Sequence, residues 1–267
     1  MNNISRQMSD ICLGIVCPMA NESKTVEAFV ENVLGYCRGF KSVVLFVILD
    51  KASTDNTYGR LLHLQNLYPE INVISAPENK NVVDAYLRGY KEAMDAHCDW
   101  ILEIDAGFSH QPSDIPQFFE KMEEGYDCVF GSRFCKNGKV EHSPFTRYLI
   151  SYGGTQLVNF LLKTKLSDMT SGFELFSNKA LERVLKEGVH SKGHFFQTEI
   201  RVNARNMNIV EVPIHYKSAS PGITISVLLD AFKNLLRLTR RRWNGSLPNS
   251  REKEIESQKC IDYYIHS

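Results

Sequence analysis

The chain has 267 residues, of which 43% are hydrophobic and 23% are charged, and its 31 basic side chains balance its 31 acidic ones. This is the composition of a globular protein that is long enough to bury one sizeable core. A formal net charge of zero excludes binding of nucleic acid through the overall charge of the chain, so we expect no nucleic-acid partner.

The cysteines and the ends of the chain bear on its location. No two of the seven cysteines form a Cys-x-x-Cys pair, which argues against a zinc site and favours buried free thiols in a reducing cytosol. Residues 1–10 are polar and carry no apolar signal segment. No stretch reaches the roughly 18 uninterrupted apolar residues of a membrane span. We therefore expect a cytoplasmic protein that is neither secreted nor membrane-spanning.

Apolar runs alternate with segments of helical periodicity along the first half of the chain. The run Ile11–Cys17 is followed by Pro18, which we expect to end a buried strand. Further strands are predicted at Ser42–Leu49, Ile71–Ser75, Trp100–Ile104 and Asp127–Gly131, and helices at Glu22–Tyr36, Tyr58–Leu67, Asn81–Ala96 and Ser113–Glu124. This alternation predicts an α/β fold, a three-layer α/β/α sandwich around a mostly parallel sheet.

The rhythm changes in the second half. We predict a long helix at Ser143–Lys163, a short strand at Gly172–Phe176, a helix at Phe196–Asn206 and a final strand at Ile209–Tyr216. The expected organisation is a flexible N-terminus (1–10), one α/β domain (11–222), a basic amphipathic helix (223–243) and a polar tail (244–267). The first half is expected to bind a nucleotide and the second half to build an acceptor site.

Three polar segments follow predicted strands, at Pro18–Ser23, Asp50–Thr57 and Asp105–His110. Ligands of open α/β sheets bind at the carboxyl ends of the strands. Carboxylates such as Asp50 and Asp105 accept hydrogen bonds from a base or ribose, or hold Mg²⁺ or Mn²⁺ against a nucleotide diphosphate. Each segment is also compatible with a capping turn, and His110 with a hydrogen bond inside its loop.

Candidate anion-binding and acidic residues follow further along the chain. Arg133 in Gly-Ser-Arg can grip a phosphate, and Arg147 and Ser151 lie four residues apart on one helix face. Solvated surface arginines are the alternative. Asp168 and Glu199 are candidates for acceptor positioning or proton transfer, or are helix caps.

Seven short strings in this order resemble those of the family 2 glycosyltransferases, closest to dolichol-phosphate mannose synthase and bacterial polyprenyl-phosphate sugar transferases. They are Pro18-Met-Ala-Asn21-Glu22, Asp50…Ser53-Thr-Asp55-Asn-Thr57, Asp105-Ala-Gly107-Phe-Ser109-His110-Gln-Pro112, Gly131-Ser-Arg133, Asp168-Met-Thr-Ser-Gly-Phe173, Phe196-Gln197-Thr-Glu199 and Glu211-Val-Pro213-Ile214. The resemblance runs from about Ile11 to Tyr216.

The resemblance implies a GT-A fold, a nucleotide-sugar donor and a division of roles. Donor-binding residues would be Pro18, Asn21, Glu22, Asp50, Ser53, Asp105 and Ser109, with Asp105 facing the metal and the diphosphate, and acceptor-phosphate residues would be Arg133, Arg147 and Ser151. Catalytic candidates are Asp105, Asp168 and Glu199.

The chain departs from the family pattern at three places. The second carboxylate of the Asp-x-Asp metal motif is replaced by Gly107, so the divalent cation would be held more weakly or completed by Ser109, His110 or water. The family's Asp-Asp-Gly-Ser turn is replaced by Asp50-Lys51-Ala52-Ser53. Ala219 and Ile225 stand where the family carries phosphate-gripping cations.

The implied reaction is an inverting transfer of a hexose from GDP-mannose or a UDP-hexose to a polyprenyl or dolichyl phosphate or to a glycan. A lipid phosphate is already an anion and requires no strong base, whereas a sugar hydroxyl would require one, for which Asp168 or Glu199 is the candidate. Two alternatives are a catalytically silent scaffold that binds a partner enzyme and, less favoured, a dinucleotide-dependent oxidoreductase, although no Gly-x-Gly-x-x-Gly follows a strand.

The segment Thr224–Trp243 has the pattern of a basic amphipathic helix. Its apolar residues at helical spacing are Ile225, Leu228, Leu229, Phe232, Leu235, Leu236 and Trp243, and its cations are Lys233, Arg237, Arg240, Arg241 and Arg242. Such a helix suits an anionic membrane surface, or else packs on the domain core. We expect a protein held peripherally at the cytoplasmic face of a membrane, with a membrane partner protein as a further candidate contact.

Overall fold

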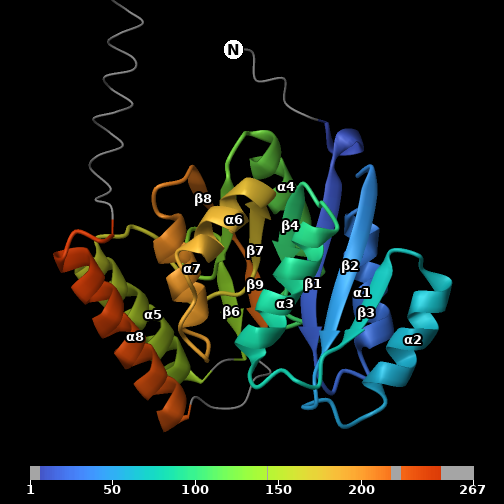
Figure 1. Cartoon of the computed structure of the whole chain (residues 1–267), viewed down its shortest axis with the longest axis horizontal. Helices are drawn as coiled ribbons and strands as arrows, with labels where there is room; N and C mark the ends of the chain where they lie inside the picture. Colours follow the sequence, from blue (N-terminus) through green and yellow to red (C-terminus); the bar gives the residue numbers. More distant parts are fainter. Residues whose placement is uncertain (1–6, 143, 218–223, 248–267) are drawn as a thin grey trace, which may run out of the picture.

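The computed structural model describes residues 7–142, 144–217 and 224–247. A seven-stranded sheet with the order β3-β2-β1-β4-β7-β5-β8 forms its centre, and helices cover both faces (Figure 1). All pairs are parallel except those of β7, which runs antiparallel to β4 and to β5. The predicted three-layer sandwich with a mostly parallel sheet is therefore confirmed.

The strands of this sheet are β1 (Cys12–Met19), β2 (Ser42–Leu49), β3 (Ile71–Ser75), β4 (Trp100–Glu103), β5 (Cys128–Ser132), β7 (Glu174–Ser177) and β8 (Ile209–Pro213). The helices are α1 (Val26–Tyr36), α2 (Thr57–Leu67), α3 (Val82–Asp95), α4 (Ile115–Glu123), α5 (Phe145–Leu162), α6 (Asn178–Lys186), α7 (Phe196–Ala204) and α8 (Ile225–Trp243), with 3-10 turns η1 (Met8–Asp10) and η2 (Pro112–Asp114). A second, two-stranded sheet pairs β6 (Lys139–Glu141) with β9 (His215–Lys217).

The core divides into two layers because successive side chains of a strand point to opposite faces of the sheet. In β1, Ile15 and Cys17 belong to the cluster that packs against α1, α2 and α4, whereas Val16 belongs to the cluster on α3, α6 and α7. Strands that are buried on both faces read as continuous apolar runs, which is why β2 has the predicted bounds. The edge strand β3, which is buried only at Ile71, also has the predicted bounds.

The expected end of the first strand at Pro18 is wrong, because β1 continues to Met19. Its ladder with β4 ends at Val16, whereas its ladder with β2 runs on to Met19. Beyond Val16 the strand is paired on one side only, and a residue without an N–H is tolerated at such an edge.

The structure differs from the sequence-based prediction at two further places. The single strand expected at Ile209–Tyr216 is divided into β8 and β9, because the ladder with β5 ends at Pro213 and the ladder with β6 begins at His215. The helix α6 was not predicted. Its first turn is capped by the Ser177 hydroxyl, which accepts from the Ala180 N–H.

The helices α5 and α8 form an outer layer at one end of the sheet, side by side (Figure 1). A small apolar cluster that includes Val158, Leu162, Leu235 and Leu238 joins them to the domain. The apolar face predicted for α8 is thereby split, since Leu235 is buried while Ile225, Leu229, Phe232 and Trp243 are exposed. None of the helices in the described part of the chain combines the length and apolarity needed to cross a bilayer.

Candidate active site

The loops that follow β1 and β2 are joined at the carboxyl edge of the sheet by Asn21. This residue adopts a positive φ of 61°, a conformation that Asn tolerates better than most residues. Its side-chain amide donates to the Ala52 carbonyl at 3.0 Å and accepts from the Thr54 N–H at 2.9 Å, while its own N–H donates to the Ser53 hydroxyl at 3.2 Å. The two loops therefore form one preorganised wall.

Backbone hydrogen bonds fix the following residues on the same wall. The Glu22 N–H donates to the Thr57 hydroxyl at 2.7 Å, and the Ser23 N–H donates to Asp55 at 3.1 Å. Hydrogen bonds from Ser23 and Thr57 hold the pKa of Asp55 well below its usual range. Asp50 closes a turn by accepting from the Ala52 N–H at 2.7 Å. The start of the Asp50–Thr57 segment therefore forms the turn that was one of its two predicted roles.

Asp105 lies just past the end of β4 and is partly exposed to solvent. Its side chain is 39% exposed, one oxygen accepts from the Tyr86 hydroxyl on α3, and the other lies 3.5 Å from Nδ1 of His110. The Asp105 N–H donates to the same Nδ1 at 3.4 Å. Burial lowers the pKa of His110, which favours a neutral ring. His110 thus makes a hydrogen bond inside its own loop, which was one of the predicted roles of this residue.

Gly107 and Glu22 occupy the place of the missing motif acid. Gly107 has a φ of 71°, and a Cβ built on it would lie 2.7 and 2.8 Å from the two carboxylate oxygens of Glu22. Real Cβ atoms essentially never approach other atoms so closely. The Glu22 carboxylate therefore stands where a side chain at position 107 would project, held there by the Thr25 hydroxyl at 2.6 Å.

The carboxylates of Asp105 and Glu22 suit a divalent cation that is held jointly by the protein and a bound diphosphate. Within the described ranges no group of three or more His, Cys, Asp or Glu side chains is placed to hold a metal. Mg²⁺ in nucleotide enzymes is usually held by one or two carboxylates and completed by substrate phosphates and water. Asp105 and Glu22 are such carboxylates, so the donor set suits a cation that arrives with a diphosphate.

A buried acidic network lies beneath Asp105. Glu103 faces Glu174 across the β4–β7 ladder and accepts from the Tyr90 hydroxyl and the Gln197 amide. Burial, and then the charge of Glu174, raise the pKa of Glu103. Burial raises the pKa of Glu174 to about 8, against the opposing charge of Arg201 3.0 Å away. We infer that this network carries fewer negative charges than its composition suggests.

Arg133 follows β5 and forms a buried, two-pronged ion pair with Asp168. Nε and Nη2 of Arg133 donate to the two Asp168 oxygens at 2.7 and 2.9 Å, and Nη2 also donates to Thr170 at 2.6 Å. Burial alone would raise the pKa of Asp168, but the charge and hydrogen bonds of Arg133 outweigh it and hold that pKa well below its usual range. The Asp168 carboxylate is thus ionised and fully engaged.

Arg147 and Ser151 lie on the first turns of α5, one turn apart. Phe134, next to Arg133 in the chain, packs edge-on against Tyr148 and Tyr152 with ring centroids 5.3 and 5.6 Å apart. These two tyrosines directly follow Arg147 and Ser151 in the sequence. The aromatic contacts therefore bring the segment of Arg133 beside the start of α5.

Glu199 has a different environment from the one that a proton-transfer role requires. Its carboxylate is fully buried, accepts from the N–H groups of His190 and Ser191 at 2.9 and 2.7 Å, and pairs with Arg237 on α8. Each of these contacts joins one part of the fold to another. The carboxylate fastens the 190–191 loop and α8 to α7 and lies away from any exposed wall.

The remaining candidates have simple placements. Pro18 is the last residue but one of β1, Ser53 lies in the loop after β2, and the Ser109 carbonyl accepts from the Lys217 N–H at 2.8 Å. Ile225 is the first residue of α8, and Ala219 lies outside the described residues. Sequence reasoning did not identify Tyr86 as a partner of Asp105, although Tyr86 and Tyr90 are four residues apart on α3 and share its buried face.

The fold and the carboxyl-edge loops define a GT-A-like glycosyltransferase architecture. Solved structures of glucosyl-3-phosphoglycerate synthase from Mycobacterium tuberculosis share this fold. The complex with Mn²⁺, uridine diphosphate and phosphoglyceric acid is 16% identical, covers 90% of this chain and 80% of its own, and gives a TM-score of 0.62. The complex with Mg²⁺ and uridine diphosphate is 17% identical, with coverages of 90% and 81% and a TM-score of 0.60.

The family model described as "Glycosyl transferase family 2" matches residues 14–185, and the chain belongs to this family. The dolichol-phosphate mannosyltransferase of Pyrococcus furiosus is 28% identical over 88% of this chain, which spans 65% of that relative's length. The polyprenol monophosphomannose synthase of Mycolicibacterium smegmatis is 26% identical, with 79% of both chains covered. The undecaprenyl-phosphate mannosyltransferase of Micrococcus luteus is 27% identical over 74% of this chain and 84% of its own.

Proposed function

We propose that the protein transfers a hexose from a nucleotide-sugar, GDP-mannose or a UDP-hexose, to a polyprenyl or dolichyl phosphate with inversion at the anomeric carbon. The observation that carries the proposal is that the loops after β1 and β2 are joined to each other, and that Glu22 of the first loop lies against Gly107, two residues from the partly exposed Asp105. Family membership and the lipid-phosphate mannosyltransferases among the relatives support it. The relatives named above give no support to the alternative of a silent scaffold.

In the proposed donor site, the loops joined by Asn21 border the nucleoside, and Asp105 and Glu22 lie beside the diphosphate. A divalent cation held there would neutralise charge that develops on the leaving diphosphate. Tyr86 and His110 hold Asp105 in place. The raised pKa values of Glu103 and Glu174 favour their protonated, neutral forms. Neutral side chains beneath Asp105 would repel the incoming diphosphate less than charged ones.

In the proposed acceptor site, Arg133, Arg147 and Ser151 bind the lipid phosphate. Asp168 is the positioning residue for Arg133, since its carboxylate fixes two nitrogens of that guanidinium. A phosphate nucleophile is already an anion at neutral pH, so alignment rather than deprotonation lowers the barrier. Because Asp168 and Glu199 are buried and engaged, a lipid phosphate suits this site better than a sugar hydroxyl that requires a base.

We further propose that α5 and α8 lie on an anionic bilayer surface. Exposed apolar side chains recur at helical spacing on both helices: Phe145, Leu149, Tyr152, Phe160, Ile225, Leu229, Phe232, Leu236 and Trp243. α5 has no acidic residue, and the one acid of α8, Asp230, is bound by Ser191. An apolar stripe flanked by cations and poor in acids suits such a surface.

The electrostatic part of this attachment is smaller than the sequence suggests. Of the five cations expected on α8, Arg237 pairs with Glu199, Arg241 pairs with Glu187, and Arg242 donates to the Leu161 carbonyl. Lys233 and Arg240 remain on the exposed surface. At about 1 kcal/mol for each cation near anionic lipid, they contribute about 2 kcal/mol, so the apolar stripe must supply most of the attachment.

A thermal-shift screen of nucleotide-sugars with Mg²⁺ and with Mn²⁺ tests the donor site, because a ligand that binds only the native state raises the melting temperature. We expect a shift with one nucleotide-sugar that requires the cation. No shift with GDP- or UDP-sugars would contradict the proposal. Vesicle co-sedimentation tests the surface: recovery should be greater with anionic than with neutral lipid and should fall in the Phe232→Ser variant. Equal recovery in the supernatant with both lipids would remove the membrane role.

A further inference from the structure

Two cysteines from distant segments of the chain, Cys12 and Cys98, have their sulfur atoms 3.7 Å apart. Cys12 is the first residue of β1 and is partly exposed, whereas Cys98 lies just before β4 and is 1% exposed. Among the cysteines in the described part of the chain, this is the one pair whose thiols are in contact. A disulfide has a sulfur–sulfur bond of about 2.05 Å, so the two sulfurs need only come closer by less than about 2 Å.

Hydrogen bonds of the main chain hold both cysteines in this position. The Cys12 N–H donates to the Asp99 carboxylate at 2.9 Å, and the Cys12 carbonyl accepts from the Asp99 N–H at 2.8 Å. The Cys98 N–H donates to the Ala93 carbonyl at 3.1 Å, and the Cys98 carbonyl accepts from the Asn178 side-chain amide at 2.8 Å. Because the main chain is fixed at both residues, the remaining approach of the sulfurs falls to the side chains.

Gly14 leaves room for the Cys98 side chain against β1. Residues two apart in a strand face the same side of the sheet, so Gly14 and Cys12 share the side on which Cys98 lies. A Cβ built on Gly14 would lie 3.0 Å from the Cys98 sulfur and 3.0 Å from the Ala93 Cβ, which is tighter than nearly all real contacts of this kind. The absence of a side chain at position 14 therefore allows the Cys98 sulfur to lie beside that of Cys12.

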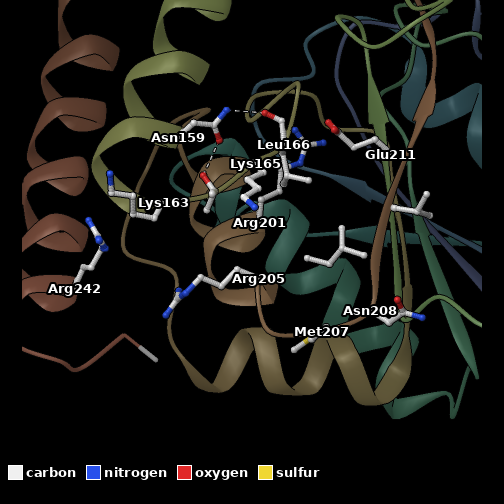
Figure 2. A pocket seen from close by; sticks show the side chains of 13 residues that line it. Asn159, Lys163, Lys165, Leu166, Arg201, Arg205, Met207, Asn208, Glu211 and Arg242 are labelled. Carbon is white, nitrogen blue, oxygen red and sulfur yellow. Dashed lines mark hydrogen bonds between the residues drawn. The ribbon is translucent and has the colours of Figure 1, made fainter. Parts of the chain in front are cut away.

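A second sulfur contact in the core is different in kind. The sulfur of Cys128 in β5 lies 3.8 Å from that of Met207, which Figure 2 shows among the residues that line a large cavity. A thioether forms no disulfide with a thiol, so this contact is one of packing alone. Cys12 and Cys98, by contrast, are two groups that can react with each other.

We propose that Cys12 and Cys98 form a dithiol that a low-molecular-weight disulfide, such as glutathione disulfide, oxidises to an intramolecular disulfide between β1 and the start of β4. The thiolate of the more exposed Cys12 attacks one sulfur of the small disulfide, whose sulfur–sulfur bond breaks. The Cys98 sulfur then attacks the Cys12 sulfur and displaces the second small thiolate. Each displaced thiolate takes up the proton that a protein thiol releases. The two protein thiols lose two electrons, and the small disulfide gains them in becoming two thiols.

Burial raises the pKa of Cys98, which keeps this residue a thiol at neutral pH and fits it to the second step. The crosslink would join residues 86 positions apart, and closing so long a loop restricts the unfolded chain strongly. It would brace the amino ends of two neighbouring parallel strands. Asp105 lies past the carboxyl end of β4, so the inference does not depend on the proposed sugar transfer, and the oxidised chain should keep any thermal shift with a nucleotide-sugar.

The test is oxidation of the folded full chain in buffers with increasing ratios of glutathione disulfide to glutathione. The remaining thiols are alkylated, and the crosslinked peptides are identified by mass spectrometry. Melting temperatures are measured on the same samples with and without dithiothreitol. Cys12→Ser and Cys98→Ala each remove one partner. The matched controls are Cys135→Ser, at a cysteine that is also partly exposed, and Cys128→Ala, at a cysteine that is also buried and in contact with a sulfur.

We expect a peptide crosslinked through Cys12 and Cys98 and a melting temperature at least about 4 °C above that of the reduced chain, which dithiothreitol reverses. Both changes should persist in the two controls and be absent from Cys12→Ser, which decides the matter should Cys98→Ala not fold. The proposal would be overturned by the absence of oxidation, by a mixed disulfide that stays on Cys12, by a crosslink through other cysteines, or by a crosslink that leaves the melting temperature unchanged.

Discussion

Replacing Gly107 by Asp restores the motif acid to a backbone that has no room for it. The left-handed φ of 71° disfavours any L side chain by about 1–2 kcal/mol. The new Cβ would also lie 2.7 Å from a Glu22 oxygen, so Glu22 must move and face a second carboxylate. We expect a total loss of about 2 kcal/mol, which is about 4–8 °C in the melting temperature of a chain of this size.

A double-mutant cycle separates the strain of the left-handed backbone from the clash with Glu22. The matched control is Gly245→Asp, because Gly245 has a φ of 69° and nothing within 4 Å of its would-be Cβ. We expect Glu22→Ala to recover at least about 1 kcal/mol of the loss in Gly107→Asp and nothing in Gly245→Asp, since distant sites are additive. Calorimetric melting of the three single and two double variants gives these values.

A further variant, Glu22→Gln, and one double variant of the cycle test the proposed donor set for the cation. Mn²⁺ bound with the nucleoside diphosphate, followed by electron paramagnetic resonance, should bind more weakly to Glu22→Gln, whereas the double variant Gly107→Asp/Glu22→Ala retains a carboxylate at that place and should bind Mn²⁺. The reasoning fails if Gly107→Asp is as stable as the native chain, or if Glu22→Ala has the same effect in both glycine backgrounds.

Three further predictions concern other residues. Asp105→Asn should abolish transfer while leaving the melting temperature within about 2 °C of the native value, with the surface variant Asp95→Asn fully active; normal turnover of Asp105→Asn at saturating donor would disprove the assignment. Arg147→Ala should raise the acceptor KM or lower kcat with little change in donor affinity, and weakened donor binding alone would show that the acceptor assignment is incorrect. Glu174 has its pKa raised from an ordinary 4.5 to about 8, so the folded state keeps a proton that the unfolded chain has released; this contribution to stability is lost as the pH rises through that window. Glu174→Gln should therefore flatten the decline of unfolding free energy between about pH 5 and 8, and an unchanged slope in urea titrations would refute it.

Much of the fold follows from the sequence because its signals are local. The strands β2 and β3 have the predicted bounds, since they are apolar runs between polar turns. The helix α6 was missed although its signals are present in the sequence, since Ser177 caps it and Ala180, Leu181 and Val184 lie on one face at helical spacing. The antiparallel β7 could not be predicted, since the direction in which a short strand joins a sheet depends on contacts distant in the chain.

The sequence predicted several residues of the candidate site but not the side chains with which they pair. Asp105 was identified from its place after an apolar strand and from the motif. The ion pair of Asp168 with Arg133 and the engagement of Glu199 depend on burial, which a sequence does not show. The contact of Glu22 with Gly107 joins two distant segments, and only the fold shows that one carboxylate stands where another is missing.

The central claim is tested most directly by transfer itself. The measurement is the transfer of radiolabelled hexose from GDP-mannose, or from a UDP-hexose, to a polyprenyl phosphate in anionic vesicles, with a soluble glycan as the competing acceptor and Asp105→Asn as the inactive control. We predict a labelled lipid product with inverted anomeric configuration that requires a divalent cation and Asp105. Label in the glycan alone, or transfer that is unchanged in Asp105→Asn, would contradict the account.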